Sequence, residues 1–283
     1  MSYVKPKQVI ENMIEAGTDK AKLSIHNMVL RGILSGALLG FGTTLAFSAE
    51  MQTKLGIVGA ILFPAAFVII ILLGLELVTG NFALIPLAVL EKKATIKEMF
   101  SNWFWVIVGH LIGGFIYAVL FVVTVTNFGT TSENMIAEKI IQVAEAKTIG
   151  YQAIGATGII VVIVKAVLCN WMVSLGAVMA MTTQSTIGKI VAMWLPILIF
   201  FAQGFEHAVV NMFVIPAGML LGADVGFGDW WVWNQIPVLF GNIIGGFIFT
   251  GLVLYATYHG FSKNGVSLYK IKQSSSIKEV EDL

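Results

Sequence analysis

Two segments of this chain repeat the same arrangement of polar residues within apolar sequence. Residues 74–86 read Gly-Leu-Glu-Leu-Val-Thr-Gly-Asn-Phe-Ala-Leu-Ile-Pro, and residues 204–216 read Gly-Phe-Glu-His-Ala-Val-Val-Asn-Met-Phe-Val-Ile-Pro. Glycine, glutamate, asparagine, isoleucine and proline recur at the same positions without a gap. Membrane sequences resemble one another by composition, but composition does not produce an ungapped correspondence of this length. The pattern therefore predicts an internal repeat.

A second pair of blocks occurs in the same order and extends the repeat. Residues 109–116 match residues 241–248, both ending in Gly-Gly-Phe-Ile, and residues 31–36 match residues 165–170 more weakly. We therefore predict two repeats, at about 28–126 and 151–260, each with three membrane spans. An odd number of spans gives the two halves opposite orientations. Inverted repeats of this kind place the substrate site at the membrane midplane, between the halves.

The composition is that of an integral membrane protein. Hydrophobic residues make up 57% of the sequence and charged residues 12%, with a mean hydropathy of +0.87, whereas soluble domains carry about 25% charged residues. A net charge of +1 argues against nucleic acid as a partner. The single cysteine and the four scattered histidines provide neither a disulfide nor a metal cluster. We expect no metal and no cofactor.

The apolar stretches predict an all-α protein with six membrane spans. Four ordinary spans are expected at about 28–48, 103–126, 163–183 and 235–258. The apolar blocks 55–90 and 190–221 are too long for one span and too short for two, and each holds prolines on both sides of its motif. Each block is therefore predicted to form a broken span, interrupted at 75–83 or 204–211. Irregular backbone at that depth must be covered by protein or line a cavity.

Two polar segments flank the predicted channel domain of residues 28–260. Residues 1–27 have the spacing of an amphipathic helix, which either lies at the membrane surface or under the pore, or takes part in gating. Residues 261–283 are expected to form a polar tail. Thirteen of the 17 basic residues fall in segments that are cytoplasmic if both termini are inside, which supports a multi-pass protein of the cell membrane in that orientation.

Three ionisable residues lie within the repeated motifs, and hence in the predicted membrane interior: Glu76, Glu206 and His207. Such groups are costly in a membrane and mark a functional site. Both repeats carry the glutamate, so it either acts in function or belongs to the architecture and fixes each break by accepting backbone N–H bonds. The amides of Asn211 and Asn242 are further candidate partners of Glu206.

His207 has no equivalent in the first repeat, where Leu77 occupies its position. Symmetry therefore does not require this histidine. We interpret it as a pore residue that faces Thr79 from the opposite repeat, with a satisfied core histidine as the alternative. Asn170 would add an amide to the hydroxyl group of Thr79. These groups suit a small polar or anionic solute.

Apolar residues around this polar centre predict a narrow, dry path, unless each serves only in core packing or lipid contact. They are Phe63, Phe67, Leu77, Val78, Val173 and Phe200. The loss of hydration on such a path would be costly for an ion.

With these motifs the chain resembles the formate/nitrite transporter family. The resemblance covers about residues 5–260 and rests on residues 74–81, 168–175, 204–216 and 241–246, of which the run Gly-Phe-Glu-His-x3-Asn-Met-Phe-x-Ile-Pro is highly specific. It implies an aquaporin-like fold and a homopentamer with one pore in each protomer. It also implies passive or proton-linked movement of small monovalent anions: formate, nitrite, hydrosulfide, or acetate and lactate.

The resemblance implies roles for individual residues as well. His207 is similar to the family's central histidine, Thr79 to the threonine that faces it, and Asn170 to the asparagine of the fourth span. One hydrophobic slit would comprise Phe67, Leu77 and Val173, and the other Phe63, Val78 and Phe200. The polar residues with a structural role would be Glu76, Glu206, Asn81, Asn211 and Asn242.

The chain departs from the family at the outer end of the fourth span. Many members carry a lysine where this sequence has Ile154. We hypothesise that Lys165 supplies the positive field that draws anions into the outer vestibule, and Lys147 is the other candidate. A lysine that only extends to the membrane surface is the alternative reading of Lys165.

The sequence therefore predicts a channel or transporter for small monovalent anions, which pass as the anion or as the protonated acid. Formate ranks first on its frequency in the family, followed by nitrite and hydrosulfide. An aquaporin-like channel for neutral solutes is the alternative, although neither break contains Asn-Pro-Ala. An enzyme is not expected, because the sequence offers no cluster of acid, base and metal ligands.

Overall fold

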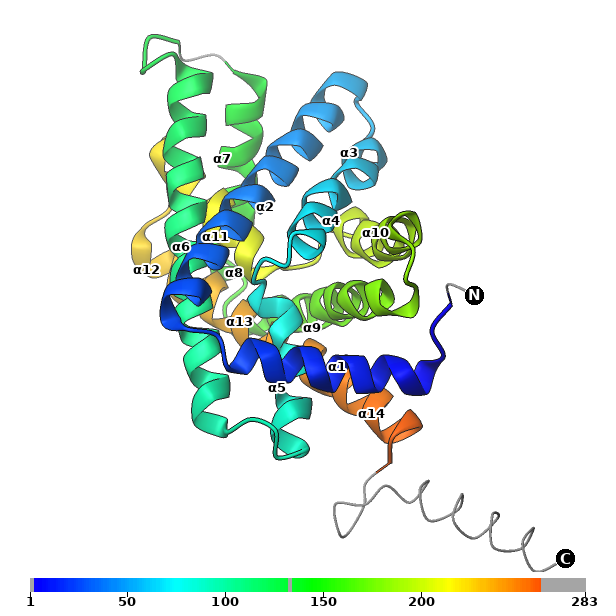
Figure 1. Cartoon of the computed structure of the whole chain (residues 1–283). Coiled ribbons are helices and arrows are strands. Elements are labelled where there is room, and N and C mark those ends of the chain that lie inside the picture. The colour runs from blue at the N-terminus through cyan, green and yellow to red at the C-terminus, as the bar shows by residue number, and fades with distance from the viewer. Residues whose placement is uncertain (1–2, 132–133, 261–283) are drawn as a thin grey trace, which may run out of the picture.

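The protein is built from helices. The computed structural model describes residues 3–131 and 134–260 (Figure 1), and this part of the chain contains no β-strand. In chain order the helices are α1 (Pro6–Ala21), α2 (Ile25–Thr53), α3 (Gly56–Leu62), α4 (Pro64–Leu72), α5 (Val78–Leu90), α6 (Ile96–Thr126), α7 (Met135–Lys147), α8 (Ile149–Gln152), α9 (Ala156–Met179), α10 (Thr186–Ala202), α11 (Ala208–Leu220), α12 (Phe227–Trp230), α13 (Ile236–Ile244) and α14 (Val253–Tyr258). The predicted polar tail, residues 261–283, lies outside the described residues.

Four helical stretches are long and apolar enough to cross a membrane. They are α2, α6, α9 with the 3₁₀ turn that follows it, and the continuous stretch Phe227–Tyr258, in which π-helical turns join α12, α13 and α14. Each covers one of the ordinary spans expected from the sequence, although the stretch with α9 ends at Thr182, one residue before the expected end. Four shorter apolar stretches complete the set in the described residues: Gly56–Leu72, Val78–Leu90, Thr186–Ala202 and Ala208–Leu220. The six-span arrangement remains a proposal, in which the short stretches pair to make two further crossings.

The helices change direction at the two repeated motifs. Helix α4 ends at Leu72 and α5 begins at Val78, while α10 ends at Ala202 and α11 begins at Ala208. Gly74 has a φ angle of 63° and Gly204 a φ angle of 64°, in the left-handed region that glycine adopts most readily. This backbone geometry explains why both motifs have a glycine at this position.

The interruption in the first repeat is shorter than the sequence analysis predicted. Residues 78–83 were expected in the break, but they belong to α5. Leu77 has an extended backbone, and its carbonyl oxygen accepts hydrogen bonds from the amides of Gly80 and Asn81, at 3.1 Å each. The helix therefore begins directly after Leu77. In the second repeat residues 208–211 were likewise expected in the break but belong to α11, which begins directly after His207, and the carbonyl of His207 accepts from Asn211 at 3.0 Å.

Small residues bring the long helices into close contact. A Cβ atom added at Gly32 of α2 would lie 2.8 Å from the carbonyl oxygen of Val106 in α6, and one at Gly36 would lie 2.7 Å from that of His110. In the other half, a Cβ atom at Gly241 of α13 would lie 2.6 Å from the carbonyl oxygen of Ile163 in α9. Glycine at these positions lets two backbones approach closely.

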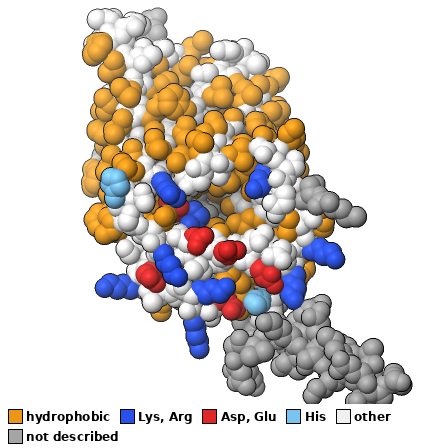
Figure 2. Space-filling view, viewed as in Figure 1, with side chains coloured by type: hydrophobic (Ala, Val, Ile, Leu, Met, Phe, Trp, Pro, Cys, Tyr) orange, Lys and Arg blue, Asp and Glu red, His pale blue; other side chains and the backbone are white. Residues whose placement is uncertain are grey.

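The amphipathic helices α1 and α7 take equivalent places in the two halves. Helix α1 packs against α5, and α7 packs against α11. In Figure 1, α1 lies across the lower part of the molecule beside α5, while α7 lies in the upper part near α6. In the view of Figure 2, hydrophobic side chains dominate the upper part of the surface, and charged side chains gather lower down, in the region of α1. Such a surface fits a membrane protein.

Replacing either motif glycine by alanine tests the role of the left-handed backbone. We expect Gly74→Ala and Gly204→Ala each to lower the free energy of unfolding by about 1–2 kcal/mol, because an L-residue is strained in that conformation. No atom lies within 4 Å of the added Cβ at either position, so the effect comes from the backbone alone. Thermal unfolding in detergent measures it. Gly228→Ala is the control, since Gly228 has equally open surroundings without a positive φ; equal unfolding temperatures for all three variants would contradict the argument.

Candidate functional site

The first turns of α5 and α11 meet in the protein interior. Thr79 is the second residue of α5, and His207 directly precedes α11. The Nε2 atom of His207 lies 3.1 Å from Oγ1 of Thr79. Both side chains are buried, Thr79 completely and His207 with 2% of its surface exposed. The two polar residues that only one of the two motifs carries therefore face each other across the interface of the repeats.

The hydrogen bonds of His207 define its tautomer. The backbone amide of Val210 donates to Nδ1 of His207 over 3.2 Å. Since an amide can only donate, Nδ1 carries no proton, and the proton of the neutral ring is on Nε2. His207 therefore donates from Nε2 to the Thr79 hydroxyl and caps α11 with Nδ1. Protonation of Nδ1 would break this cap.

Asn170 holds the backbone of the site through hydrogen bonds. Its Nδ2 atom donates to the carbonyl oxygen of Thr79 at 3.0 Å and to that of Asn242 at 2.6 Å. The hydroxyl group of Ser174 donates to the same Thr79 carbonyl at 3.1 Å. The sequence analysis did not include Ser174, although it lies one helical turn beyond Asn170 and hence on the same face of α9. Asn170 thus positions the backbone of Thr79, and its contact with a solute stays a prediction.

A network of charged and amide side chains lies beside each half-helix. In the first, Glu76 binds the Nζ atom of Lys20 at 2.7 Å and Nδ2 of Asn81 at 2.7 Å. Asn81 also donates to Oδ1 of Asn102 at 2.8 Å, and Asn102 donates to the carbonyl oxygen of Lys20 at 2.9 Å. The four residues therefore form a closed ring that links α1, α5 and α6.

The second network reproduces the first, bond for bond. Glu206 binds Nζ of Lys147 at 2.8 Å and Nδ2 of Asn211 at 2.8 Å. Asn211 donates to Oδ1 of Asn234 at 2.8 Å, and Asn234 donates to the carbonyl oxygen of Lys147 at 2.9 Å. In addition, the hydroxyl group of Tyr151 donates to Glu206 at 2.8 Å. Burial raises the pKa of Tyr151 above its usual value, so that this hydroxyl remains a donor.

These networks identify the partners of the glutamates: the candidate Asn211 does bind the Glu206 carboxylate, whereas two other expectations are not met. Within the described residues, neither carboxylate accepts a backbone N–H; each is balanced by a lysine and an asparagine. Asn242 donates to the backbone carbonyl of Glu206 at 3.0 Å, and not to its carboxylate. The pairing of these lysines with the glutamates was missed because Lys20 and Lys147 lie in the amphipathic helices, outside the repeats defined from sequence. The sequence did contain one indication of this pairing. Each lysine lies in the last turn of the amphipathic helix that precedes the first span of its half.

The structure also revises the assignment of Lys165. Its Nζ atom lies 3.3 Å from the Tyr151 hydroxyl and 5.6 Å from the centre of that ring. A cavity of about 330 Å³ opens next to His207 and Phe200, and Lys147 and Lys139 line it, whereas Lys165 does not. Ile154, the residue at the family's lysine position, is exposed at the surface. Lys147 is therefore the better candidate for the lysine of this vestibule.

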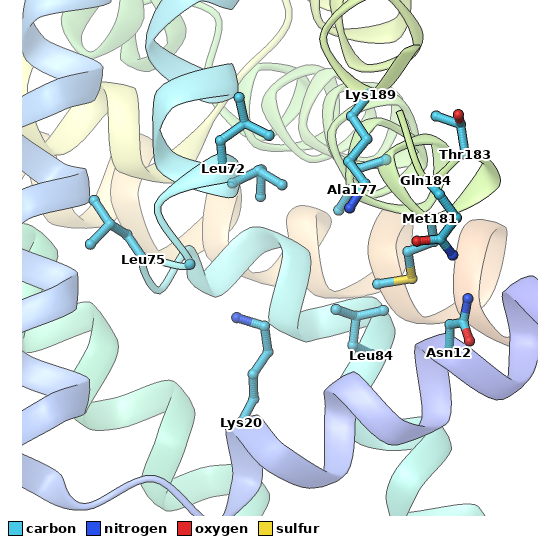
Figure 3. Close-up of a pocket in the computed structure, with 13 residues that line it drawn as sticks. Asn12, Lys20, Leu72, Leu75, Leu84, Ala177, Met181, Thr183, Gln184 and Lys189 are labelled. Atoms are coloured by element: carbon cyan, nitrogen blue, oxygen red, sulfur yellow. The ribbon is translucent and has the colours of Figure 1, made fainter. Parts of the chain in front are cut away.

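A second cavity, of about 400 Å³, lies on the other side of the site. It is bordered by α1, by the segment between α4 and α5, and by α9 and α10. In Figure 3, Lys20 enters it from α1 and Lys189 from α10, with Leu75 at its edge. Each of the two cavities is thus lined by lysine side chains. Among the described residues, no cluster of histidine, cysteine or acidic residues could hold a metal ion.

The predicted apolar residues belong to one buried cluster, which reaches His207 through Phe200. Each exposes 2% or less of its surface: Phe63, Phe67, Leu77, Val78, Val173 and Phe200. The ring of Phe200 lies 5.7 Å from that of His207 and 5.7 Å from that of Phe63. Phe201, which the sequence analysis did not consider, stacks on Phe63 at 4.0 Å. The role of these residues as two constrictions stays a prediction.

Comparison with known proteins now assigns the chain. A family model described as formate/nitrite transporter matches residues 7–256. The chain belongs to the formate/nitrite transporter family. The resemblance deduced from the motifs is thereby confirmed. The chain is 35% identical over 281 residues to the uncharacterized transporter YrhG of Bacillus subtilis, with 97% of this chain and 100% of that protein covered.

Other members of the family include proteins named formate channels. The formate channel BtFdhC of Bacillus thuringiensis is 32% identical, covering 91% of this chain and 97% of its own. The formate channel FocA of Escherichia coli K12 is 28% identical, with 86% and 90% covered. A solved structure of an FNT family ion channel matches with a TM-score of 0.76 at 26% identity, over 88% of this chain and 98% of that one. The helical fold is therefore that of the family.

The buried charge pair provides a test of the second network. We expect Lys147→Met to lower the free energy of unfolding by about 3 kcal/mol, because it leaves the Glu206 carboxylate buried without its cation. The double variant Lys147→Met/Glu206→Gln is expected to recover most of that loss, and unfolding in detergent measures both. Lys139→Met is the control: its partner Glu50 is 31% exposed, and such pairs contribute about 1 kcal/mol or less. A double variant as unstable as Lys147→Met would refute the assignment.

Proposed function

We propose that the protein is a membrane channel for small monovalent anions, with formate as its first candidate substrate. The observation that carries this proposal is the His207–Thr79 hydrogen bond, a single polar contact enclosed by apolar side chains. Lysine-lined cavities lie on either side of it. The formate channel BtFdhC, at 32% identity, supports the choice of formate. The function is transport, and the proposal includes no enzymatic step.

Charge and burial favour passage as the protonated acid. Burying an anion among apolar side chains costs several kcal/mol even after relaxation. For an acid of pKa about 4, roughly one molecule in 10³ is neutral at pH 7, which corresponds to a cost of about 4 kcal/mol. Lys147 and Lys20 line the cavities while their partner carboxylates are buried behind them, and Lys189 adds a further positive charge, so the anion would be attracted to the cavities. Protonation in the cavity would then allow it to cross.

His207 would serve this passage as a hydrogen-bond donor. Its Nδ1 atom is occupied by the Val210 amide, so the ring offers only the Nε2 proton to a solute. A carboxyl oxygen or a nitrite oxygen can accept that bond in place of Thr79. The N-termini of α5 and α11 add partial positive charge at the same point. The proton that neutralises the anion would come from water in the cavity and not from His207.

Assembly and orientation are part of the proposal. A solved protein described as a pentameric formate channel with formate bound matches this fold with a TM-score of 0.67 at 23% identity. By analogy we propose a homopentamer with one pore in each protomer, in the cell membrane, with both termini in the cytoplasm. Large apolar side chains exposed along α2, α6 and α9, such as Leu34, Phe104 and Ile160, would contact lipid or a neighbouring protomer.

Substrate choice and pH dependence can be measured in proteoliposomes. We expect formate uptake well above that of protein-free liposomes, rising by up to about tenfold as the external pH falls from about 8 to about 7, since the neutral fraction rises in that proportion. Nitrite, hydrosulfide and acetate are tested in parallel. Faster nitrite or hydrosulfide flux would support the other anions of the family. Flux of water alone would support the aquaporin-like alternative, and anion flux independent of pH would refute passage as the acid.

The vestibule lysine can be identified with two variants. We expect Lys165→Ala to leave formate flux within about twofold, since Lys165 does not line the cavity. The double variant Lys147→Met/Glu206→Gln, which avoids an unpaired buried carboxylate, is expected to lower flux, most strongly at low ionic strength where the lysine field is least screened. The opposite ranking of the two variants would restore Lys165 as the vestibule lysine.

A further inference from the structure

A second histidine is buried next to the site and has no part in the proposed passage. His110 lies in the middle of α6 and exposes none of its surface. Its Nε2 atom lies 3.1 Å from the backbone nitrogen of Val78, the first residue of α5. Its Nδ1 atom lies 2.9 Å from the carbonyl oxygen of Gly32 in α2 and 3.3 Å from the hydroxyl group of Ser35.

These contacts determine the protonation of His110. The Val78 amide can only donate, so Nε2 must present a lone pair. The Gly32 carbonyl can only accept, so Nδ1 must carry the proton. The ring is therefore neutral, with its proton on Nδ1. His207 is the opposite tautomer, with its proton on Nε2. A protonated His110 would direct an N–H group at the Val78 amide and lose that bond.

The other repeat performs the same task with an amide. His110 and Asn242 occupy the same position in the matching blocks that begin at Gly109 and Gly241. Asn242 accepts from the backbone nitrogen of Ala208, the first residue of α11, at 3.0 Å, and donates to the carbonyl oxygen of Ala166 at 2.8 Å. An asparagine does not titrate. The first N–H of each half-helix is thus anchored in the same way, but only at α5 is the acceptor of that first N–H a titratable ring.

We propose that His110 is a positioning residue for Thr79. In its neutral form it holds the first N–H of α5 and so sets Thr79 at hydrogen-bond distance from His207; on protonation it releases that end of α5. The inference rests on the proposed function, because the effect of His110 on Thr79 is measured as a change in anion transport. Thr79 directly follows Val78, so a shift of the Val78 amide moves Thr79 against His207.

The surroundings of His110 fit this role. Its charged and titratable neighbours are the Glu76 carboxylate, which is paired with Lys20, and His207. Ser35, which touches Nδ1, donates to the backbone carbonyl of Glu76 and so ties α2 to the same break. Close contact of α2 with α6 at Gly32 and Gly36 leaves no room for even a methyl group. Within the described residues, no other acceptor contacts the Val78 amide.

Substitutions at His110 test the proposal through transport. His110→Leu removes the acceptor and is expected to lower formate flux by roughly tenfold or more, because a buried N–H is left without a partner. His110→Asn copies the other repeat, and His110→Gln places an amide oxygen near the position of Nε2. At least one of these two is expected to keep flux at pH 7 within about threefold of wild type.

The pH dependence of formate flux distinguishes a positioning role of His110 from a role in packing alone. As the pH falls from about 7 to about 4, protonation of His110 disables the wild type, so the ratio of the amide variant's flux to wild-type flux is expected to rise. His26→Asn, a change at an exposed histidine, is the control and should give a constant ratio. The proposal is overturned if His110→Leu transports like wild type, if neither amide restores flux, or if the ratio stays flat.

A spectroscopic test does not depend on transport. In protein with ¹⁵N-labelled histidine, the spectrum at neutral pH should contain one ring with its proton on Nδ1, and His110→Asn should remove it. Absence of that signal would refute the tautomer and with it the proposal. If wild-type protein carries no anion but the signal is present, the proposed function fails while the anchoring of α5 by His110 stands.

Discussion

A helix that begins inside an apolar protein interior presents backbone N–H groups that must find acceptors. Helices α5 and α11 both begin there, and the structure depends on how their first amides are satisfied. His110 accepts from α5, Asn242 accepts from α11, and His207 caps α11 a second time. His110 lies on α6 and Asn242 on α13. The close packing of α6 with α2 and of α13 with α9 lets each of these side chains donate to a carbonyl of the neighbouring helix while it accepts from the half-helix.

The same half-helices carry the buried charges of the protein. Each carboxylate is balanced by a lysine from an amphipathic helix and accepts a hydrogen bond from the asparagine five residues later, Asn81 for Glu76 and Asn211 for Glu206. A buried ion pair adds little net stability compared with an apolar pair of the same shape, but it is favourable only when the two charged groups are held in a well-defined geometry. Helices α1 and α7 are thereby fixed against α5 and α11. We infer that the structural repeat begins with these helices, earlier than the repeats at 28–126 and 151–260 drawn from sequence.

In the proposed function, the site is formed by residues that differ between the two repeats. His207 stands opposite Leu77, and Thr79 opposite Val209, so one repeat supplies the ring and the other the hydroxyl group. His110 stands opposite Asn242 and introduces a titratable anchor in one half. A symmetric pair of breaks provides the enclosed centre with partial positive charge from both helix ends. In the proposed function, the asymmetric residues decide what that centre can bind.

The sequence by itself determined the membrane character, the all-helical fold, the repeat, and the four residues Glu76, Thr79, Glu206 and His207 as its unusual members. Hydropathy and ungapped spacing are local properties, and they can be read without a structure. Only the tertiary structure decided the partners. Lys20 reaches Glu76 from a separate helix, and Lys165 turns to Tyr151 rather than to the cavity. Which lysine meets which carboxylate, and which tautomer a buried histidine adopts, depends on how helices distant in sequence cross, and the spacing of residues along one helix does not contain that information.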